Sequence, residues 1–200
     1  MSSNYRLLDS YLVKGENGGQ VNIFSEGIEF SFEAVPHKFY FWRDLTSYLY
    51  SVQKTTVRLY GIIPLYRTTK YNISLQFQDE ELITFKKRNY PELDKLSTML
   101  LQVTLEPLLS KYIGRIADGS TLKYDKLSID KTGVSQGKKA VAWFDVESAK
   151  VENGIVSVYA RNPLKPNKPG LIGTVNFQTP NAHVLSPLIN SIVESSRRNR

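Results

Sequence analysis

Trp42-Arg43-Asp44-Leu45-Thr46-Ser47 and Trp143-Phe144-Asp145-Val146-Glu147-Ser148 follow one pattern, W-x-D-[L/V]-x-S, and contain the two tryptophans of the chain. Each copy is preceded by a glycine with a β-branched residue after it, Gly27-Ile28 and Gly133-Val134. Each copy also continues into an apolar pattern of helical spacing. An internal repeat of this kind predicts one small module, strands followed by a helix, that is present twice.

Period-two alternation predicts the strands of the first copy. Residues 20–32 alternate apolar and polar side chains around the turn Ser25-Glu26-Gly27, which favours a hairpin. Residues 1–18 instead show an apolar spacing that predicts one or two helical turns before Gly15. Further strands of a β-meander are expected at 39–42, 45–52, 57–60, 71–77 and 82–85.

A helix is expected to close each copy. The first begins near Pro91 and is kinked or restarted at Pro107. The second begins at Thr179-Pro180, or else at Pro187 behind a Ser186 cap. Strands of the second copy are expected between the helices, at 121–130, 140–143, 147–151, 155–160 and 171–177.

The composition favours two cores held by packing alone. The 200 residues are 41% hydrophobic, and a repeat suits two cores of about a hundred residues each. There is no cysteine, so neither disulfides nor thiolate metal sites contribute. Residues 1–6 lack a basic region followed by an apolar run, and no stretch reaches the ~18 to 20 apolar residues that cross a bilayer. We expect a cytoplasmic protein without a transmembrane segment.

These patterns predict an α+β fold that is mainly β. We expect two modules in tandem, residues 1–115 and 116–200, each an antiparallel β-meander or partly closed barrel capped by its C-terminal helix. A single ten-stranded barrel is disfavoured because a helical pattern lies between the two sets of strands.

Three segments carry the motifs W-x-[DE]-[IV], G-x-V and P-N-x-x-V in this order: residues 142–146, 151–156 and 179–185. In this the second module resembles an uncharacterised family of pleckstrin-homology-like (PH-like) proteins. The first module matches more loosely, through Gly27, Trp42 to Leu45 and the helix from Pro91. It departs from the pattern in its extra strand sequence around residues 60–71 and its lack of P-N-x-x-V. The resemblance implies tandem PH-like domains of unknown function; PH-like folds serve as lipid-binding, peptide-binding or structural modules.

No constellation of catalytic, cofactor-binding or metal-binding residues stands out. Four residues of the repeat are interpreted as structural anchors, in preference to a ligand cleft: Trp42, Asp44, Trp143 and Asp145. The only two imidazoles, His37 and His183, are expected in an exposed hairpin and in a first helical turn. Neither a G-x-S-x-G nor a G-K-[S/T] motif occurs, so we expect no catalysis and no cofactor.

Basic residues are in excess in the second half. Residues 1–115 carry 14 Lys/Arg against 12 Asp/Glu, and residues 116–200 carry 12 against 7, for a net charge of +7. Eight residues are candidate contacts to an anionic surface: Lys138, Lys139, Arg161, Lys165, Lys168, Arg197, Arg198 and Arg200. The loops before Ala140 and after Ala160 are expected at opposite ends of the meander, which favours diffuse attraction over one focused lipid site. A solvated terminus is the other interpretation of the last four residues.

Residues 58–71 interleave aromatic and basic side chains. This pattern suits a stacking platform for single-stranded nucleic acid, but Tyr and Thr are also good strand formers, so nucleic acid is not the expected partner. Residues 61–65 are apolar for a loop and are the best candidate for a protein-contact surface.

The leading hypothesis is a non-enzymatic cytoplasmic scaffold that binds a protein partner. One alternative is peripheral attachment to anionic membrane lipids through the basic loops and the arginine tail. Another is an internal carrier whose small-molecule or lipid ligand lies beside Trp42 or Trp143.

Overall fold

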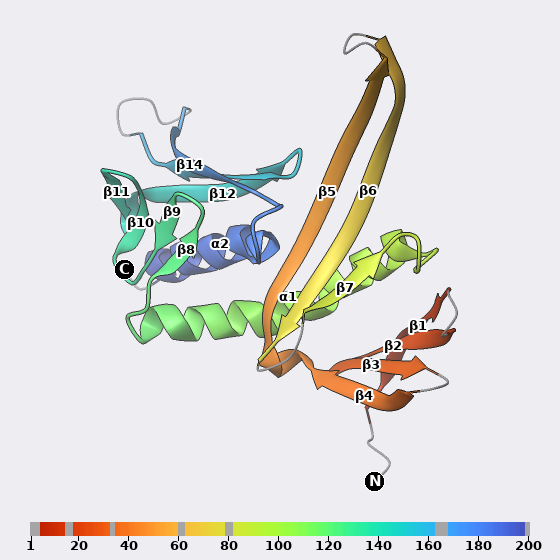
Figure 1. Cartoon of the computed structure of the whole chain (residues 1–200). Coiled ribbons are helices and arrows are strands. Elements are labelled where there is room, and N and C mark those ends of the chain that lie inside the picture. Colours follow the sequence, from red (N-terminus) through yellow and green to blue (C-terminus); the bar gives the residue numbers. More distant parts are fainter. Residues whose placement is uncertain are drawn as a thin grey trace. The chain divides into compact units, whose positions relative to one another are not determined.

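A computed structural model describes residues 5–14, 18–32, 35–59, 63–78, 82–162 and 168–198, with side chains at all of these except 35, 53–59 and 63–69. Its fold is α+β and mainly β, as predicted, and the described strands form four antiparallel sheets beside two α-helices (Figure 1). The chain divides into two compact units, Met1–Thr104 and Leu105–Arg200. That division falls inside the first α-helix, and the modules 1–115 and 116–200 stay a prediction.

The first set of elements is a four-stranded meander, a 3-10 turn, a three-stranded meander and a helix. The four strands are β1 (Leu7–Val13), β2 (Gly19–Phe24), β3 (Gly27–Phe32) and β4 (Val35–Phe41), in this order in the sheet. After the turn η1 (Trp42–Asp44) come β5 (Leu45–Leu59), β6 (Ile63–Phe77), β7 (Ile83–Lys86) and α1 (Leu93–Ala117).

The second set repeats this order. The four strands are β8 (Leu122–Tyr124), β9 (Leu127–Ile129), β10 (Gly133–Gln136) and β11 (Lys139–Ala142). The turn η2 (Trp143–Asp145) leads to β12 (Val146–Glu152), β13 (Ile155–Ala160), β14 (Gly170–Asn176) and α2 (Ala182–Arg198). Both four-stranded and both three-stranded sheets are meanders of sequential neighbours, so the sequence repeat corresponds to a structural repeat.

The repeated tryptophans make matching hydrogen bonds in the two units. The Trp42 indole Nε1–H donates to Phe24 O at 3.0 Å, and its backbone N–H donates to Glu26 O. Trp143 donates through Nε1 to Asp130 O at 2.9 Å and through its backbone to Thr132 O. Both side chains are buried. Each tryptophan therefore ties the end of one meander to the turn before its third strand.

The repeated glycines lie where two strands approach too closely for a side chain. A Cβ at Gly27 would lie 2.2 Å from Tyr40 O, and one at Gly133 would lie 2.0 Å from Val141 O. Both obstacles are backbone atoms of the neighbouring strand, which cannot rotate away. The pattern of Gly followed by Trp-x-Asp thus marks a close approach of two paired strands and the indole that holds them in place.

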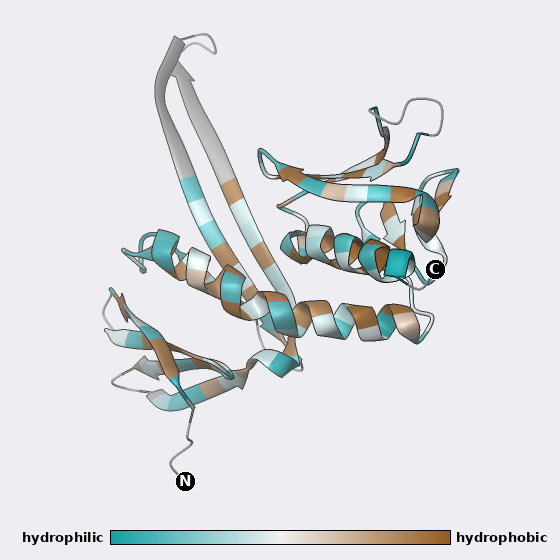
Figure 2. Cartoon of the chain, turned by 180° about the vertical axis from the view of Figure 1, so that it is seen from behind, coloured by the Kyte–Doolittle hydropathy of each residue, from teal (hydrophilic) through white to brown (hydrophobic). Residues whose placement is uncertain are grey.

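Each helix buries a stripe of apolar side chains. In α1 the buried residues Leu93, Leu96 and Leu100 step by three and four. In α2 the apolar side includes Leu185, Leu188 and Ile189, whereas hydrophilic residues occupy the other side (Figure 2). Strand β12 is one of the elements against which α2 packs.

Three local predictions were wrong. Residues 7–13 form a strand rather than helical turns, because β1 pairs with β2 from Leu7 to Val13. Residues 45–52 and 57–60, expected as separate strands, belong largely to the single long strand β5. Residues 121–130 contain two strands, β8 and β9, which are joined by a tight turn with Asp125 at a φ of 54°.

For each helix, one of the two alternatives predicted at its proline is wrong. Helix α1 continues through Pro107 and does not restart there. Helix α2 begins at Ala182, so Pro187 lies inside it and is not its first-turn residue.

Candidate functional site

The face of the first sheet opposite its core carries an unusual number of aromatic side chains. Ile28 and Phe30 of β3 are buried on the core face, and Tyr40 of β4 packs there against Phe30 with ring centroids 5.8 Å apart. Strand alternation places Phe39 and Phe41, the neighbours of Tyr40, on the other face. We call this surface the aromatic patch and define it by five residues: Tyr5, Leu7, Phe24, Phe39 and Phe41.

The rings of the aromatic patch contact one another. Phe39 lies at the centre, with its centroid 5.2 Å from Tyr5, 5.6 Å from Phe24 and 5.0 Å from Phe41. The Arg43 guanidinium lies 4.5 Å from the centroid of the Phe41 ring, in cation–π range. The aromatic rings are only partly buried, and Leu7 is 52% exposed. The patch is therefore a packed aromatic surface that solvent reaches.

Gly27 lies directly beneath the patch. A Cβ at this position would lie 2.5 Å from Cε1 of Phe39, in addition to its clash with the backbone of β4. The absence of a side chain lets the Phe39 ring pack down on β3. Gly27 is thus required both for the close approach of β3 and β4 and for the arrangement of the patch.

A row of polar side chains lies beside the patch. Asn22 bridges Ser10 and Glu29, and Glu29 Oε1 lies 3.6 Å from His37 Nδ1. Ser31 Oγ is 3.2 Å from His37 Nε2. Ser31 contacts His37 and His37 contacts Glu29, which is the serine–histidine–acid connection of a catalytic triad. The His37 side chain, however, is 65% exposed on an open sheet. A triad depends on a water-excluded, preorganised setting, so we interpret the row as a polar border of the patch.

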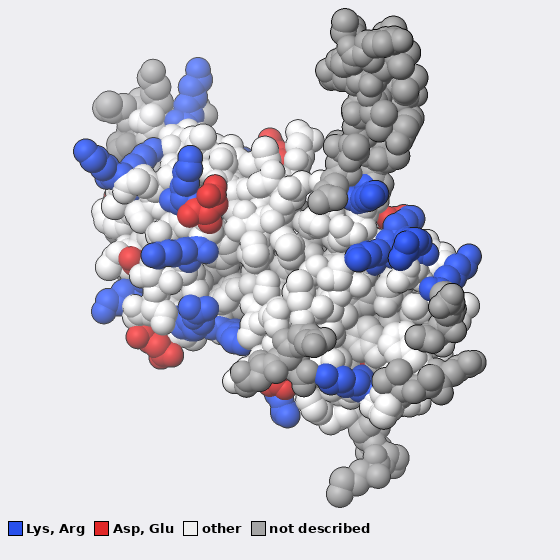
Figure 3. Space-filling view, viewed as in Figure 1, with Lys and Arg blue, Asp and Glu red and all other residues white. Residues whose placement is uncertain are grey.

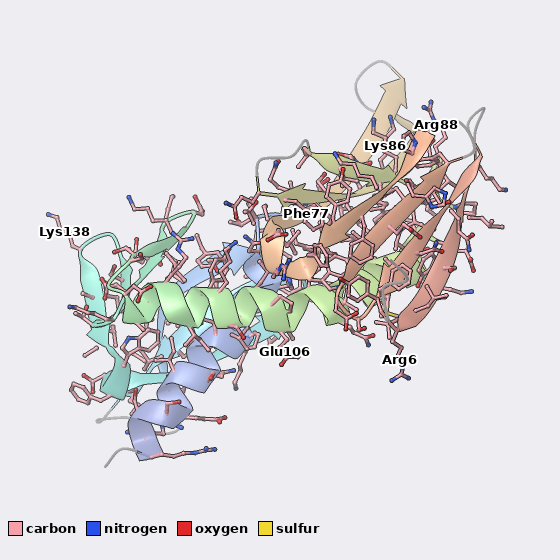
Figure 4. All side chains as sticks on the ribbon, turned by 90° about the horizontal axis from the view of Figure 1, so that it is seen from below. Arg6, Phe77, Lys86, Arg88, Glu106 and Lys138 are labelled. Atoms are coloured by element: carbon pink, nitrogen blue, oxygen red, sulfur yellow. The ribbon has the colours of Figure 1, made fainter. Side chains whose placement is uncertain are left out.

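The basic loops of the second unit lie at one end of their sheets, which corrects the prediction of opposite ends. Lys139, at the start of β11, donates through Nζ to Leu171 O near the start of β14 at 2.5 Å. Lys138, in the β10–β11 turn, and Lys168, before β14, are both exposed. Figure 4 shows Lys138 extending from its turn, and Lys and Arg outnumber Asp and Glu on the face in Figure 3.

The arginines proposed for an anionic surface are engaged within the protein. Arg161 Nε and Arg197 Nη2 lie 3.4 Å and 3.8 Å from the same Glu147 oxygen, and Arg197 also donates to Glu147 O. Arg198 pairs with Glu194 at 3.9 Å. Lys165 and Arg200 lie outside the described residues. Placed in the last turn of α2, Arg197 and Arg198 also suit the negative end of the helix dipole.

The predicted anchor aspartates act through their backbone. Asp44 O accepts the N–H of Gln78 at 2.8 Å, and Asp145 O accepts that of Arg161 at 2.7 Å. Each bond joins the 3-10 turn to the chain that follows the second strand of the next sheet. Their position fits closure of the module.

Asp130 shapes the turn before Gly133. Its Oδ1 accepts the backbone and hydroxyl hydrogens of Thr132 and the N–H of Gly133. These bonds, with those from Thr132 first, lower the pKa of the Asp130 carboxyl. A hollow of about 280 Å³ lies beside the β10–β11 hairpin and is lined partly by Asp130 and Ala142. Neither Trp42 nor Trp143 lines it, so it gives no support to a carrier site beside a tryptophan.

Burial perturbs the imidazole of His183. It lies in the first turn of α2, as predicted, and desolvation lowers its pKa from 6.5 to about 4. Among the described residues, no three His, Cys, Asp or Glu side chains gather closely enough to hold a metal ion. Within the same part of the chain, neither helix is both long and apolar enough to cross a membrane.

Sequence reasoning did not find the aromatic patch. The available signal was the run Phe39-Tyr40-Phe41-Trp42, in which consecutive residues are all aromatic. A strand with one solvated face alternates apolar and polar residues, so an unbroken aromatic run indicates that both faces have apolar neighbours. The predicted contact segment 61–65 is only partly described: residues 61 and 62 lie outside the described residues, and 63–65 belong to β6.

The chain was compared with known proteins. The family model described as "Family of unknown function (DUF6585)" matches residues 10–198. No curated protein matches the chain.

Proposed function

Since the chain belongs to DUF6585, a family of unknown function, we propose its role from the geometry: it is a non-enzymatic, cytoplasmic interaction module that binds a protein partner through the aromatic patch. The observation that carries this proposal is the contact of Tyr5, Phe24 and Phe41 around Phe39 on a solvent-reached sheet face. Phe, Tyr and Arg are enriched in the buried centres of protein–protein interfaces, and polar residues form their rims. The patch has this composition, with Arg43 on Phe41 and the row from Ser10 to His37 at its border.

The proposed architecture is a tandem of PH-like domains. The repeated order of four strands, a 3-10 turn, three strands and a helix supports it, as do the matching bonds of Trp42 and Trp143. In this proposal the tryptophans and glycines build the scaffold, and the surface of the first unit supplies recognition. A scaffold with no assigned chemistry suits a binding role, although fold alone does not decide function.

The proposal is tested by affinity capture from the source cells, followed by binding measurements with the purified captured protein. Phe39→Ser removes the central ring, and hot-spot residues contribute 2 kcal/mol or more, so we expect Kd to rise about thirtyfold or more. Leu171→Ser is the matched control, because Leu171 is a 50% exposed apolar residue of β14.

The control should change Kd by less than about twofold. Circular dichroism and the melting temperature establish that both variants remain folded. A partner that binds Phe39→Ser as tightly as the unaltered protein would show that the patch is not the docking surface.

A further inference from the structure

The edge strands β4 and β11 are equivalent members of the repeat. Directly before the repeated tryptophans, residues 38–41 read Lys-Phe-Tyr-Phe and residues 139–142 read Lys-Ala-Val-Ala. Each strand lies at the edge of its four-stranded sheet and pairs with the strand that begins at the repeated glycine. At the two positions that face away from the core, the first unit therefore has phenylalanine and the second unit has alanine.

A hollow lies on the outer face of β10 and β11 at these alanines. Gly133 and Ser135 share this face with Ala142 and Ala140, their respective partners in the register. All four residues line the hollow of about 280 Å³, and none of its eight lining residues is aromatic. The second unit thus has open space over its repeated glycine.

In the first unit an aromatic ring fills the equivalent place. The Phe39 ring packs so closely on β3 that a Cβ at Gly27 would lie 2.5 Å from its Cε1 atom. In the second unit Ala140 stands where Phe39 does and supplies no ring. A cavity of about 150 Å³ is enough for benzene, so the hollow has room for an aromatic side chain. The repeat therefore indicates the kind of group that fits over Gly133.

The rim of the hollow is polar. Thr132 and Ser135 belong to its lining and carry hydroxyl groups. Thr132 donates its hydroxyl hydrogen to Asp130, so its oxygen can accept a hydrogen bond from a ligand. Tyrosine combines a ring with a polar atom that needs a partner when buried. A tyrosine side chain suits both the floor and the rim.

The backbone of β11 can hold an extended segment beside the hollow. The Trp143 N–H donates to Thr132 O at 3.3 Å, and this bond sets the alternation of the antiparallel pair. The N–H groups of Ala140 and Ala142 and the carbonyl of Ala140 consequently point away from β10. A strand added at this edge would pair with these groups and place alternate side chains over the alanines.

The charge around the hollow is of one sign. Lys131, Lys138 and Lys139 lie along the hairpin, and no Asp or Glu occurs from residue 131 to residue 144. Lys131 and Lys138 are exposed, and Figure 4 shows Lys138 extending from its turn. This charge favours an acidic partner segment and disfavours a second copy of the chain, whose own β11 carries the same lysines.

We propose that the second unit binds an extended, acidic segment of a partner protein, which adds to the edge of β11 and places a tyrosine side chain in the hollow over Gly133. The proposal goes beyond the aromatic patch, which lies on a sheet of the first unit. It holds whether or not the patch binds a partner.

The first test is a titration of the ¹⁵N-labelled full chain with the peptide acetyl-Glu-Thr-Tyr-Thr-Glu-amide, followed by NMR. We expect the largest shift changes at the amides of Gly133, Ala140 and Ala142. Replacement of the peptide's tyrosine by alanine removes the buried ring and should raise Kd at least about tenfold. Replacement of both glutamates by lysine should also weaken binding, most strongly at low salt.

Methylated peptides test the added strand. Alternate residues of such a strand direct their N–H groups to β11. Methylation of the tyrosine nitrogen and methylation of both threonine nitrogens should therefore have unequal effects, with one peptide losing binding and the other retaining it.

Ala140→Phe tests the hollow from the side of the protein. The new ring takes the place that Phe39 has in the first unit, so we expect it to shift the Gly133 signals without peptide and to raise Kd of the peptide at least about tenfold. Thr174→Phe adds the same ring at an exposed position of β14 and should change Kd by less than about twofold. The peptide variants decide the matter if Ala140→Phe does not fold.

Four results would overturn the inference: no shifts at these amides at millimolar peptide, equal binding of the peptide without tyrosine, peptide binding that a folded Ala140→Phe leaves intact, or concentration-dependent shifts at Ala140 and Ala142 without peptide, which would identify a second copy as the occupant. Phe39→Ser should retain peptide binding, so failure of the aromatic-patch proposal and failure of this one are distinguishable.

Discussion

Gly27 and Gly133 show how a single residue type decides the module. Each lies where the neighbouring strand leaves no room for a Cβ. A Cβ on Gly27 would lie 2.2 Å from a backbone oxygen of that strand, and a Cβ on Gly133 would lie 2.0 Å from one. The nearby tryptophan then stabilises the same close approach with two hydrogen bonds. The close approach and the bonds are coupled, because strands pushed apart would also separate the indole from its carbonyl acceptor.

Gly133→Ala is therefore expected to destabilise the second unit by about 1–3 kcal/mol, the usual cost of forcing atoms into a packed site. Chemical denaturation measures the free energy of unfolding. Gly170→Ala is the control, since a Cβ there meets nothing within 4 Å. Equal stability of the two variants would mean that the close approach of β10 and β11 does not require a glycine at position 133.

His183 predicts an acid sensitivity of the second unit. Burial lowers its folded pKa to about 4 from 6.5, so the unfolded chain binds the proton more readily between these values. The stabilising effect of the neutral imidazole is complete above about pH 6.5 and is lost as the pH falls toward 4, by roughly 3 kcal/mol at most.

His183→Gln should flatten this part of the profile of unfolding free energy against pH, whatever its effect at neutral pH. His37→Gln, at a 65% exposed imidazole, serves as the control. An unchanged slope in His183→Gln would assign the acid sensitivity to other groups.

At the scale of elements, α2 is joined to the edge strand β12 by side-chain hydrogen bonds. Asn190 accepts the N–H of Ala149 at 2.8 Å and donates to its carbonyl at 3.0 Å, and Ser186 Oγ donates to the same carbonyl. The side-chain amide of Asn190 thus takes the place that a neighbouring strand would occupy. This arrangement fixes where the helix crosses the sheet.

Asn190→Ala should lower the free energy of unfolding by about 2 kcal/mol, because it removes two hydrogen bonds and leaves a partly buried N–H without its acceptor. Ser195→Ala, on an exposed position of the same helix, should change stability by less than about 0.5 kcal/mol. Urea denaturation of both variants makes the comparison. A cost no greater for Asn190→Ala than for Ser195→Ala would contradict the docking role of the amide.

Elements with strong periodicity and turn chemistry were predictable from sequence, and elements set by pairing were not. The repeat, the α+β class and the strands with buried alternation were read from the spacing of residues such as Val21, Ile23 and Ile28. Strand β1 was missed because the spacing of its leucines also fits a helix, and only pairing with β2 decides between them. The length of β5 was missed because its Thr-rich middle gives no apolar alternation.

The candidate sites also divide into features that the sequence shows and features that depend on contacts between distant residues. The tryptophans and glycines were visible as a repeat, and their role follows from local geometry. The aromatic patch needed knowledge of which face of the sheet covers the core, and the ion pair of Arg161 with Glu147 needed contacts between residues distant in the chain. Charge counted along a sequence does not reveal which charges are already paired.

At the scale of the whole molecule, the scaffold is common to both units, whereas the binding surface of the proposed function belongs to the first unit. The repeated module supplies a scaffold in both units, and the first unit adds the aromatic patch. The patch is the central claim, because the proposed function depends on it.

The measurement that tests this claim most directly is site-specific photocrosslinking in the source cells, with benzoylphenylalanine in place of Phe41. Phe144, a 53% exposed phenylalanine in η2, provides the matched control position. We predict that one defined protein is joined covalently through position 41 and is absent at position 144. Equal adducts at both positions, or none at position 41, would contradict the assignment of the aromatic patch as the docking surface.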